Sequence, residues 1–363
     1  MSGAGREMLC LDDVERIARE SLPADVWDFV SGGSGAEATL SANRAALRRI
    51  ELIPRVLRDV EHCTTETTLF GDSLAMPVAT AAFAYQRLVH PEGEVAAARA
   101  AKAAGVPFTV GTLSSCPVEA ITEIGGTVWF QLYWLRDREK TFELVRRAED
   151  AGCRALMLTV DVPWMGRRLR DVRNRFVLPA GVEAANLTWG SSSEAHRSPA
   201  SGSAVASHTQ AALAPSLTWT DVEELRSRTT LPLILKGVLA AEDARRAADM
   251  GVDAVVVSNH GGRQLDGAVA SIDALAPVVA AVDGDCRVLF DSGVRHGTDV
   301  LKALALGADG VLLGRPVLWG LAAAGEQGVR RVLELVAEEL LDALGLAGCG
   351  SVAEARAINT VTG

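Results

Sequence analysis

The stretch RVLFDSGVRHGTDVLKALALGADGVLLGRP, residues 287–316, contains one complete structural unit and the start of the next. An apolar run, RVLF, leads through a glycine-containing loop into a leucine- and alanine-rich segment with helical spacing, 298–306. Gly307 follows at the position where helices commonly end in a left-handed residue. A second apolar run, GVLL, comes next. A strand, a helix and another strand in this order are typical of a βα unit in a parallel sheet.

The same unit recurs along the chain from residue 76 onward. Further helical segments close on Gly105, Gly152 and Gly251. Eight strands with intervening helices predict an α/β fold of the (β/α)8, or TIM barrel, type. A doubly wound open sheet is the alternative, but it seldom contains eight such regular units. The candidate strands are MPVATAA (76–82), VPFTVGT (106–112), TVWFQLY (127–133), ALMLTVD (155–161), LPLILKG (231–237), DAVVVSN (253–259), RVLFDSG (287–293) and GVLLGRP (310–316).

We predict a single domain that spans residues 1–363. Residues 1–75 read as a helical cover with a short hairpin, 76–320 as the barrel, and 321–363 as a C-terminal helix and tail. Residues 181–215, after the fourth strand, are rich in serine and alanine and have no clear period. Long segments of this kind are often functional loops, so we expect a mobile lid here.

Composition excludes several classes of partner. The chain has 48% hydrophobic and 23% charged residues, as expected of a globular protein with a large core. Its net charge of −10 argues against binding to nucleic acid or to an anionic membrane. No apolar stretch approaches the roughly 18 residues that span a bilayer, and residues 1–20 lack a signal core. The six cysteines form no CxxC pair, so we predict reduced thiols, no metal site and a cytoplasmic location.

The loops after the seventh and eighth strands predict an anion site. Chemistry in such barrels gathers at the carboxyl ends of the strands, and a phosphate is often held there. DSGVRHG and GRP supply glycines, whose backbone N–H groups can close on an anion, and the side chains of Arg295 and Arg315, which add bidentate donors.

A second set of polar side chains at these strand ends predicts a bound carboxylic acid. The planar guanidinium groups of Arg168 and Arg263 suit a carboxylate. His260 can accept a proton near neutral pH, and Asp161 can hold its other ring nitrogen. Lys236, at the end of an apolar strand, has two interpretations from the sequence. It forms a Schiff base, as in barrel aldolases, or it stays charged beside an electron-rich cofactor.

Other segments are given structural roles. Met157 and Met165 are expected to fill the core. Arg167 is expected to be solvated or to have a structural partner. The glycine-rich SGGSG, residues 31–35, follows no strand and is therefore interpreted as a turn and not as a phosphate loop.

Several motifs together resemble those of the FMN-dependent L-2-hydroxy acid oxidases and dehydrogenases. The resemblance implies an FMN cofactor and the oxidation of a 2-hydroxy acid to a 2-keto acid, with O2 reduced to hydrogen peroxide. Members are commonly tetramers, so it also implies a homo-oligomer. The motifs are SNHGGRQLDG (258–267), LTVDVPWMGRR (158–168), FQLYW (130–134), NRFVLP (174–179), LILKGV (233–238), DSGVRHGTDVLKALALGA (291–308), LLGRPVLWGLAAAGEQGV (312–329), HPEGE (90–94) and VWDFVSGGSGAE (26–37).

The resemblance also implies roles for individual residues. His260 would be the catalytic base, paired with Asp161. Arg168 and Arg263 would bind the substrate carboxylate, and Tyr133 would hydrogen-bond the substrate hydroxyl or the keto oxygen. The residues expected to contact the flavin ring are Ala82, Phe83, Ala84, Gly111, Gln131, Thr159, Lys236 and Ser258. Those expected around the phosphate are Asp291, Ser292, Gly293, Val294, Arg295, Gly314 and Arg315.

The chain departs from the small-substrate members of this family at four positions. Phe29 stands where a tyrosine is typical, Gly111 and Leu113 replace a serine and a tryptophan, and Tyr85 replaces a methionine. These changes predict a pocket, lined in part by Phe29, for an aromatic acid such as mandelate or 4-hydroxymandelate. A dehydrogenase with another electron acceptor, an enzyme for lactate or glycolate, and a Schiff-base aldolase remain as alternatives. Membrane-bound mandelate dehydrogenases carry an apolar anchor after the fourth strand, and residues 181–215 lack one.

Overall fold

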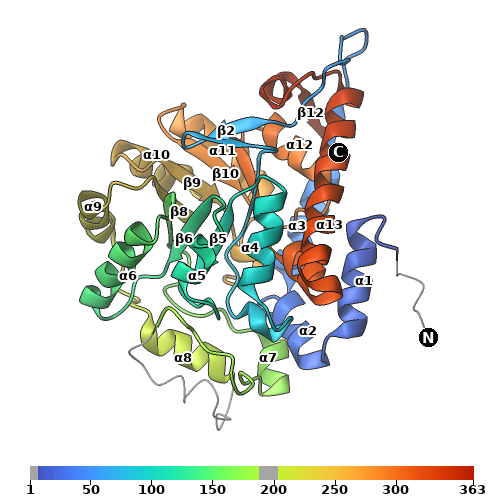
Figure 1. The fold of residues 1–363 in the computed structure, drawn as a ribbon. Helices are drawn as coiled ribbons and strands as arrows, with labels where there is room; N and C mark the ends of the chain where they lie inside the picture. The colour runs from blue at the N-terminus through green and yellow to red at the C-terminus, as the bar shows by residue number, and fades with distance from the viewer. Residues whose placement is uncertain (1–6, 188–202) are drawn as a thin grey trace, which may run out of the picture.

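A closed ring of eight parallel strands forms the centre of the molecule (Figure 1), in a computed structural model that describes residues 7–187 and 203–363. The strand order is β4-β11-β10-β9-β8-β7-β6-β5. The backbone N–H of Thr80 donates to the carbonyl of Pro107 (2.9 Å) and joins the two outermost strands of this order. The predicted (β/α)8 barrel is therefore confirmed. Its strands are β4 (Val78–Thr80), β5 (Phe108–Gly111), β6 (Val128–Leu132), β7 (Ala155–Thr159), β8 (Leu233–Val238), β9 (Ala254–Val257), β10 (Arg287–Phe290) and β11 (Gly310–Leu313).

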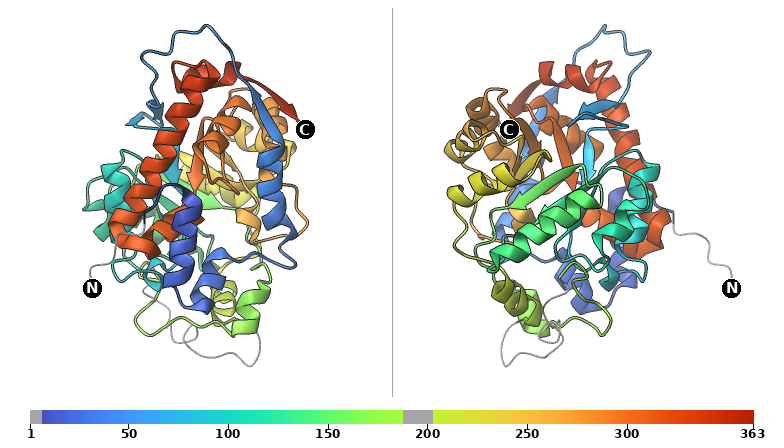
Figure 2. Two further views of the ribbon diagram at one scale, coloured as in Figure 1. Left: turned by 90° about the vertical axis from the view of Figure 1, so that its right-hand side faces the viewer. Right: turned by 60° about the vertical axis from the view of Figure 1, so that its left-hand side comes forward.

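Helices surround the barrel (Figures 1 and 2). The four glycines predicted to end helices, at positions 105, 152, 251 and 307, all have positive φ, between 65° and 101°. The last helix is interrupted at Ala324 and Gly325, whose backbone angles are not helical. The helices are α4 (Glu94–Ala103), α5 (Val118–Thr122), α6 (Arg138–Asp150), α9 (Trp219–Arg228), α10 (Ala241–Asp249), α11 (Ser271–Val282), α12 (Gly297–Ala305) and α13 (Arg315–Ala347).

Apolar side chains fill the barrel interior. One side-chain cluster inside it includes Trp129, Met157 and Val256, each exposed by 1% or less. The antiparallel hairpin of β2 (Thr67–Leu69) and β3 (Asp72–Leu74) closes this interior, and the rings of Phe70 and Trp129 meet edge to face at 5.7 Å. The hairpin lies at the opposite end of the molecule from α8 (Figure 1). One end of the barrel is thus packed for stability, and the carboxyl ends of the strands are left for chemistry.

The N-terminal segment covers the barrel with α1 (Leu11–Ser21), α2 (Ala24–Ser31) and α3 (Ala38–Arg49). Strand β1 (Ile50–Ile53) then pairs antiparallel with β12 (Asn359–Thr362), which follows the short helix η4 (Val352–Ala357). The sequence did not predict this pairing of segments about 300 residues apart. Across the described residues, no helix has the length and apolar character needed to cross a membrane.

The segment predicted as a loop, 181–215, contains a helix, α8 (Ala204–Ala212). The expectation of irregular structure is therefore wrong for these residues, whose high alanine content favours a helix. Backbone bonds join the end of α8 to the chain just after β6: Ala214 donates to Trp134 (2.9 Å), and Arg136 donates to Ala212 (3.0 Å). Residues 188–202 of the predicted lid lie outside the described part of the chain. A further short helix, α7 (Leu169–Asn174), follows the fourth barrel strand.

Candidate active site

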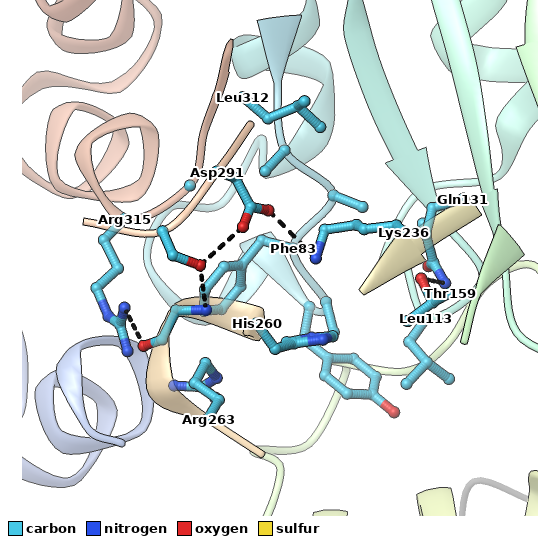
Figure 3. A pocket seen from close by; sticks show the side chains of 18 of the residues that line it. Phe83, Leu113, Gln131, Thr159, Lys236, His260, Arg263, Asp291, Leu312 and Arg315 are labelled. Atoms are coloured by element: carbon cyan, nitrogen blue, oxygen red, sulfur yellow. Dashed lines mark hydrogen bonds and ion pairs between the residues drawn. The ribbon is translucent and has the colours of Figure 1, made fainter. Parts of the chain in front are cut away.

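The predicted site residues surround one pocket at the carboxyl ends of the strands (Figure 3). Its empty volume is about 1080 Å³, part of it open to solvent. Every residue predicted for the site lines this pocket except Asp161 and Ser258. Both of these contact a lining residue: Asp161 bonds His260, and Ser258 accepts from Lys236. The structure thus brings the predicted residues together around one pocket.

His260 and Asp161 form a hydrogen-bonded pair. His260 follows β9 and opens the short turn η3 (His260–Gly262) with a positive φ of 58°. Its Nδ1 lies 3.0 and 3.2 Å from the two carboxylate oxygens of Asp161, which leaves Nε2 for a ligand in the pocket. Asp161 reaches this position because β8 bulges at Gly237, where a Cβ atom would overlap the carboxyl group. A side chain at position 237 would therefore displace Asp161, so glycine at this position allows the pair to form.

The electrostatic surroundings keep His260 ready to accept a proton. Burial lowers the pKa of His260, and the nearby Lys236 lowers it further, while Asp161 opposes both; the net direction is below 6.5. Burial raises the pKa of Asp161, but His260 and Lys236 outweigh it, and the net direction is down. At neutral pH the pair is therefore a neutral imidazole beside a carboxylate, which is the state that a general base requires.

This arrangement predicts how kcat/KM depends on pH. Only the neutral imidazole can accept a proton, so kcat/KM should be constant above about pH 6.5 and fall about tenfold per unit once pH drops below the depressed pKa. Because Asp161 raises the pKa of His260, the Asp161→Asn variant should move this acid limb to lower pH and also lower the plateau. Steady-state profiles between about pH 4 and 8 test both effects. An acid limb centred above pH 7 in the unmodified enzyme would contradict the assignment of His260 as this base.

Two buried asparagines hold the loop that carries His260 and Arg263. The Nδ2 of Asn43, in α3, donates to the Oδ1 of Asn259 (2.8 Å), and the Nδ2 of Asn259 donates back to the Oδ1 of Asn43 (2.7 Å). The Oδ1 of Asn259 also accepts the N–H of Gly262 (3.0 Å). The backbone N–H of Asn259 donates to the Oγ of Ser271 (2.9 Å). Helix α3 of the N-terminal cover thereby holds the loop that carries His260 and Arg263 in place.

Removing one amide of this pair should disturb both stability and catalysis. In Asn43→Ala, the buried amide of Asn259 loses two of its hydrogen bonds, so the free energy of unfolding should fall by about 1–3 kcal/mol. The loop should also become less well ordered, and kcat/KM should decrease by about 10-fold or more. Chemical denaturation and steady-state kinetics measure the two effects. Asn359, exposed on β12, provides the control. Asn359→Ala should change neither the free energy of unfolding nor kcat/KM. An unchanged kcat/KM in Asn43→Ala would refute the positioning role of Asn43.

Arg168 and Arg263 place buried positive charge in the pocket. The Nη1 of Arg263 donates to the carbonyls of Phe29 (2.7 Å) and Gly32 (3.0 Å), and its guanidinium lies 5.4 Å from the ring centres of Phe29 and Phe83. The Nε of Arg168 is buried without a hydrogen-bond partner. Burial lowers the pKa of Arg263 well below its ordinary value, and repulsion from Arg168 adds to this. Among the described residues, neither arginine forms an ion pair within 4.0 Å. An anionic ligand would therefore compensate the free-energy cost of burying each guanidinium charge.

Arg295 and Arg315 form a second positive region. Burial and their neighbouring arginines lower the pKa of Arg295 to about 9 and that of Arg315 to about 10. Arg315 donates to the carbonyls of Val30 (3.2 Å), Gly32 (2.8 Å) and Gly261 (2.9 Å). It therefore also links the end of α2 to the loop that carries His260 and Arg263. Figure 3 shows Arg315 on the opposite side of His260 from Leu113. Its phosphate role stays a prediction.

Lys236 is held as a cation. Its Nζ lies 3.2 Å from the Oδ2 of Asp291 and donates to the Oγ of Ser258 (3.1 Å). Burial lowers the pKa of Lys236, but Asp291 and Asp161 more than compensate, and the net direction is up. A lysine that stays protonated is a poor nucleophile, so the geometry favours the interpretation of a charge beside an electron-rich ring over a Schiff base.

Comparison with known proteins decides the family. A family model described as FMN-dependent dehydrogenase matches residues 18–360. The chain belongs to the FMN-dependent dehydrogenase family. The 4-hydroxymandelate oxidase of Amycolatopsis orientalis is 60% identical over 97% of this chain and 98% of its own length. The L-lactate oxidase of a Nostoc species is 48% identical, over 94% and 95%. A crystal structure of mandelate oxidase with (S)-4-hydroxymandelic acid superposes with a TM-score of 0.96 and 60% identity, covering 98% of this chain and 99% of the other.

Membership in the FMN-dependent dehydrogenase family makes FMN the cofactor, and the Schiff-base aldolase is therefore wrong as an alternative. The residues present fit this group. Lys236 is a cation at only 5% exposure, as the electron-rich edge of a flavin ring requires. Small or glycine positions at Ala82, Gly111 and Gly314 leave room along the pocket wall. The arginine pair 295 and 315 suits the phosphate.

Some lining residues were missed by sequence reasoning. Met165 packs against the core, as predicted, but it is only half-buried and also lines the pocket. Its position three residues before Arg168, a predicted site residue, was the available signal. Val205 and Thr209 reach the pocket from α8, one helical turn apart. No signal identified them, because the helix itself was not predicted. Arg167 is exposed, as expected.

Proposed function

We propose that this protein oxidises an aromatic (S)-2-hydroxy acid, 4-hydroxymandelate or mandelate, to the 2-keto acid and reduces O2 to hydrogen peroxide. One observation carries the proposal: the His260–Asp161 pair and the buried Arg168 and Arg263 face the same pocket. A 2-hydroxy acid has its carboxylate and its hydroxyl on neighbouring carbons, and this site offers a partner to each. The 60% identity to a 4-hydroxymandelate oxidase supports the same substrate class.

Each protein group then has a defined task. Arg168 and Arg263 bind and orient the carboxylate through bidentate, charge-assisted hydrogen bonds. Tyr133 lies close enough to Arg168 and Arg263 for their charges to affect its pKa, so its hydroxyl faces the carboxylate end. Nε2 of His260 accepts a proton from the substrate, and Asp161 stabilises the resulting imidazolium. When bound, FMN would supply the two-electron redox chemistry: the two electrons and the second proton that the substrate loses would pass through it to O2, which also takes the proton from His260 to give hydrogen peroxide. Lys236 keeps a positive charge close to the reacting centre.

The walls of the pocket favour an aromatic side chain on the acid. Phe83, Leu113, Met165 and Val205 line it with apolar surface. Leu113 stands where smaller-substrate members carry a tryptophan, which leaves more room. An aromatic ring would cover this apolar surface, whereas the methyl group of lactate would leave most of it in contact with water.

A visible spectrum recorded anaerobically tests the proposal. The purified protein should be yellow, bleach on addition of (S)-4-hydroxymandelate, and recover its colour when air is admitted. Bleaching without recovery would replace the oxidase by a dehydrogenase with another electron acceptor. Bleaching by lactate or glycolate and not by the aromatic acid, or faster turnover of glycolate than of mandelate, would overturn the aromatic substrate.

We also propose a homotetramer located in the cytoplasm. The tetramer is supported by family membership, and the location by the six cysteines, which are all free thiols, as expected in a reducing compartment. Light scattering coupled to size exclusion would measure the mass of the assembly against the 38.2 kDa of one chain.

A further inference from the structure

Two buried hydroxyl groups that line the active-site pocket have no hydrogen-bond partner among the residues that the structure describes. They are the phenol of Tyr85 and the Oγ of Thr209, each in a side chain that is 1% exposed. A buried polar group without a partner is costly, so such groups usually mark a ligand position. The Nε of Arg168 is a third unpartnered atom in this pocket, and the proposed carboxylate accounts for it. The two hydroxyls are not explained by any group common to all 2-hydroxy acids.

Tyr85 lines the pocket in a segment that adjoins the end of β6, where Tyr133 stands. Its backbone is held in the left-handed region (φ 57°), and its N–H donates to the carbonyl of Leu113 (3.0 Å). The neighbouring Thr112 accepts the N–H of Tyr133 (3.0 Å), so these segments are adjacent. The pKa of Tyr133 responds to Asp161, Lys236 and both arginines, whereas that of Tyr85 responds only to burial and to Tyr133. Tyr85 therefore lines the pocket beside Leu113 and the strand end that carries Tyr133, and no charged side chain is among the groups that shift its pKa.

Thr209 approaches the same region from α8. Val205, one turn earlier on this helix, also lines the pocket. Leu213, one turn later, forms an antiparallel bridge with Leu135, two residues after Tyr133. Helix α8 is thus attached beside the strand end that carries Tyr133, and Thr209 and Tyr85 line the same pocket from the two segments that adjoin this strand end.

We propose that Tyr85 and Thr209 form a recognition site for a hydroxyl group at the para position of the substrate ring. This inference rests on the proposed function and specifies its substrate as a phenolic 2-hydroxy acid. The arginines fix the carboxylate at one end, and the two hydroxyls satisfy the phenol at the other. A phenolic group both donates and accepts, so it can pair with each of them at once. Burial raises the pKa of Tyr85, which therefore stays protonated and able to donate.

The first test compares (S)-4-hydroxymandelate with (S)-mandelate, two substrates that differ by one hydroxyl. The unmodified enzyme should have the higher kcat/KM for 4-hydroxymandelate. Tyr85→Phe and Thr209→Val should each lower kcat/KM for 4-hydroxymandelate by about tenfold, with mandelate changed less than about twofold. The double variant should lose the preference. If the ratio of the two kcat/KM values is unaffected by these substitutions, the recognition site is refuted.

A second test does not depend on turnover. Phenylacetate and 4-hydroxyphenylacetate lack the 2-hydroxyl group and so cannot be oxidised at this position. Their Kd values can be measured from the change in flavin absorbance. The para-hydroxyl should tighten binding to the unmodified holoenzyme by about tenfold and should have no effect in Tyr85→Phe. Equal Kd values for the two acids in the unmodified holoenzyme would overturn the proposal.

Stability separates recognition from a structural role. Because the Tyr85 hydroxyl has no partner in the described part of the chain, Tyr85→Phe should not lower Tm; a lower Tm would show a structural bond and count against the proposal. Thr109→Val is a matched control, since the Oγ of Thr109 is also buried and unpartnered but Thr109 does not line the pocket. Its substrate ratio should equal that of the unmodified enzyme, and a shifted ratio would mean that the assay does not report on this site.

The outcomes also distinguish this inference from the proposed function. An unmodified enzyme that oxidises both aromatic acids with equal kcat/KM would leave the proposed oxidation intact and overturn the para-hydroxyl site. An enzyme that oxidises neither acid would overturn both.

Discussion

Replacing His260 with asparagine should lower kcat by roughly 10²–10⁴-fold, the range typical of a lost general base. Asparagine is the informative substitution for two reasons. Its amide nitrogen can take the place of Nδ1 and keep the bond to Asp161. It also tolerates the positive φ of 58° at this position better than most residues. Only the basic Nε2 is then lost, and the surroundings of the site are retained.

The binding of substrate should separate this effect from a collapse of the pocket. Arg168 and Arg263 are unchanged in His260→Asn, so the Kd of the substrate should stay within about threefold of the original value. Flavin content and Tm should also be retained. His62, which is exposed, supplies the control, since His62→Asn should leave kcat unchanged. More than a tenth of the original kcat in His260→Asn would exclude His260 as the catalytic base.

The barrel was predictable because its pattern is local. Each strand is a short apolar run, and four of the intervening helices end at a glycine that adopts positive φ, as at Gly307. The grouping of the proposed catalytic residues was predictable because the fold brings all strand ends to one face. His260 and Asp161 are 99 residues apart in the chain, and the barrel rule alone was enough to place them together.

What could not be predicted depends on contacts between distant segments. The reciprocal pair of Asn43 and Asn259 joins positions 216 residues apart, and neither residue is unusual in its own segment. The SGGSG stretch was correctly interpreted as a turn, but its Gly32 carbonyl accepts from both Arg263 and Arg315. Every residue has a backbone carbonyl, so nothing in the sequence indicated that this one would accept hydrogen bonds from two arginines. Helix α8 was missed for a different reason: its composition gives no apolar stripe.

Replacing Arg168 with methionine should reduce kcat/KM by about 10²–10⁴-fold, mainly through weaker binding of the carboxylate. Loss of one partner from a buried charged pair costs about 3–5 kcal/mol, which corresponds to this range. In the substrate-free enzyme, however, Arg168 has no ion pair within 4.0 Å among the described residues, and its Nε is unpartnered. Stability should therefore change little, because the removed charge was buried at a cost.

Arg263→Met should differ from Arg168→Met in one respect that the structure defines. Arg263 donates to the carbonyls of Phe29 and Gly32 and so holds the end of α2 against the catalytic loop. Its loss should weaken the carboxylate site to a similar degree and, in addition, lower the free energy of unfolding by about 1–3 kcal/mol.

Arg168→Lys, which keeps the charge but not the planar fork, should recover part of the lost affinity. Kd values for an inert carboxylate, measured with denaturation curves for the same variants, test this. Equal stability of the two methionine variants would show that the Arg263 bonds to α2 contribute nothing, and an unchanged Kd in Arg168→Met would remove Arg168 from the substrate site.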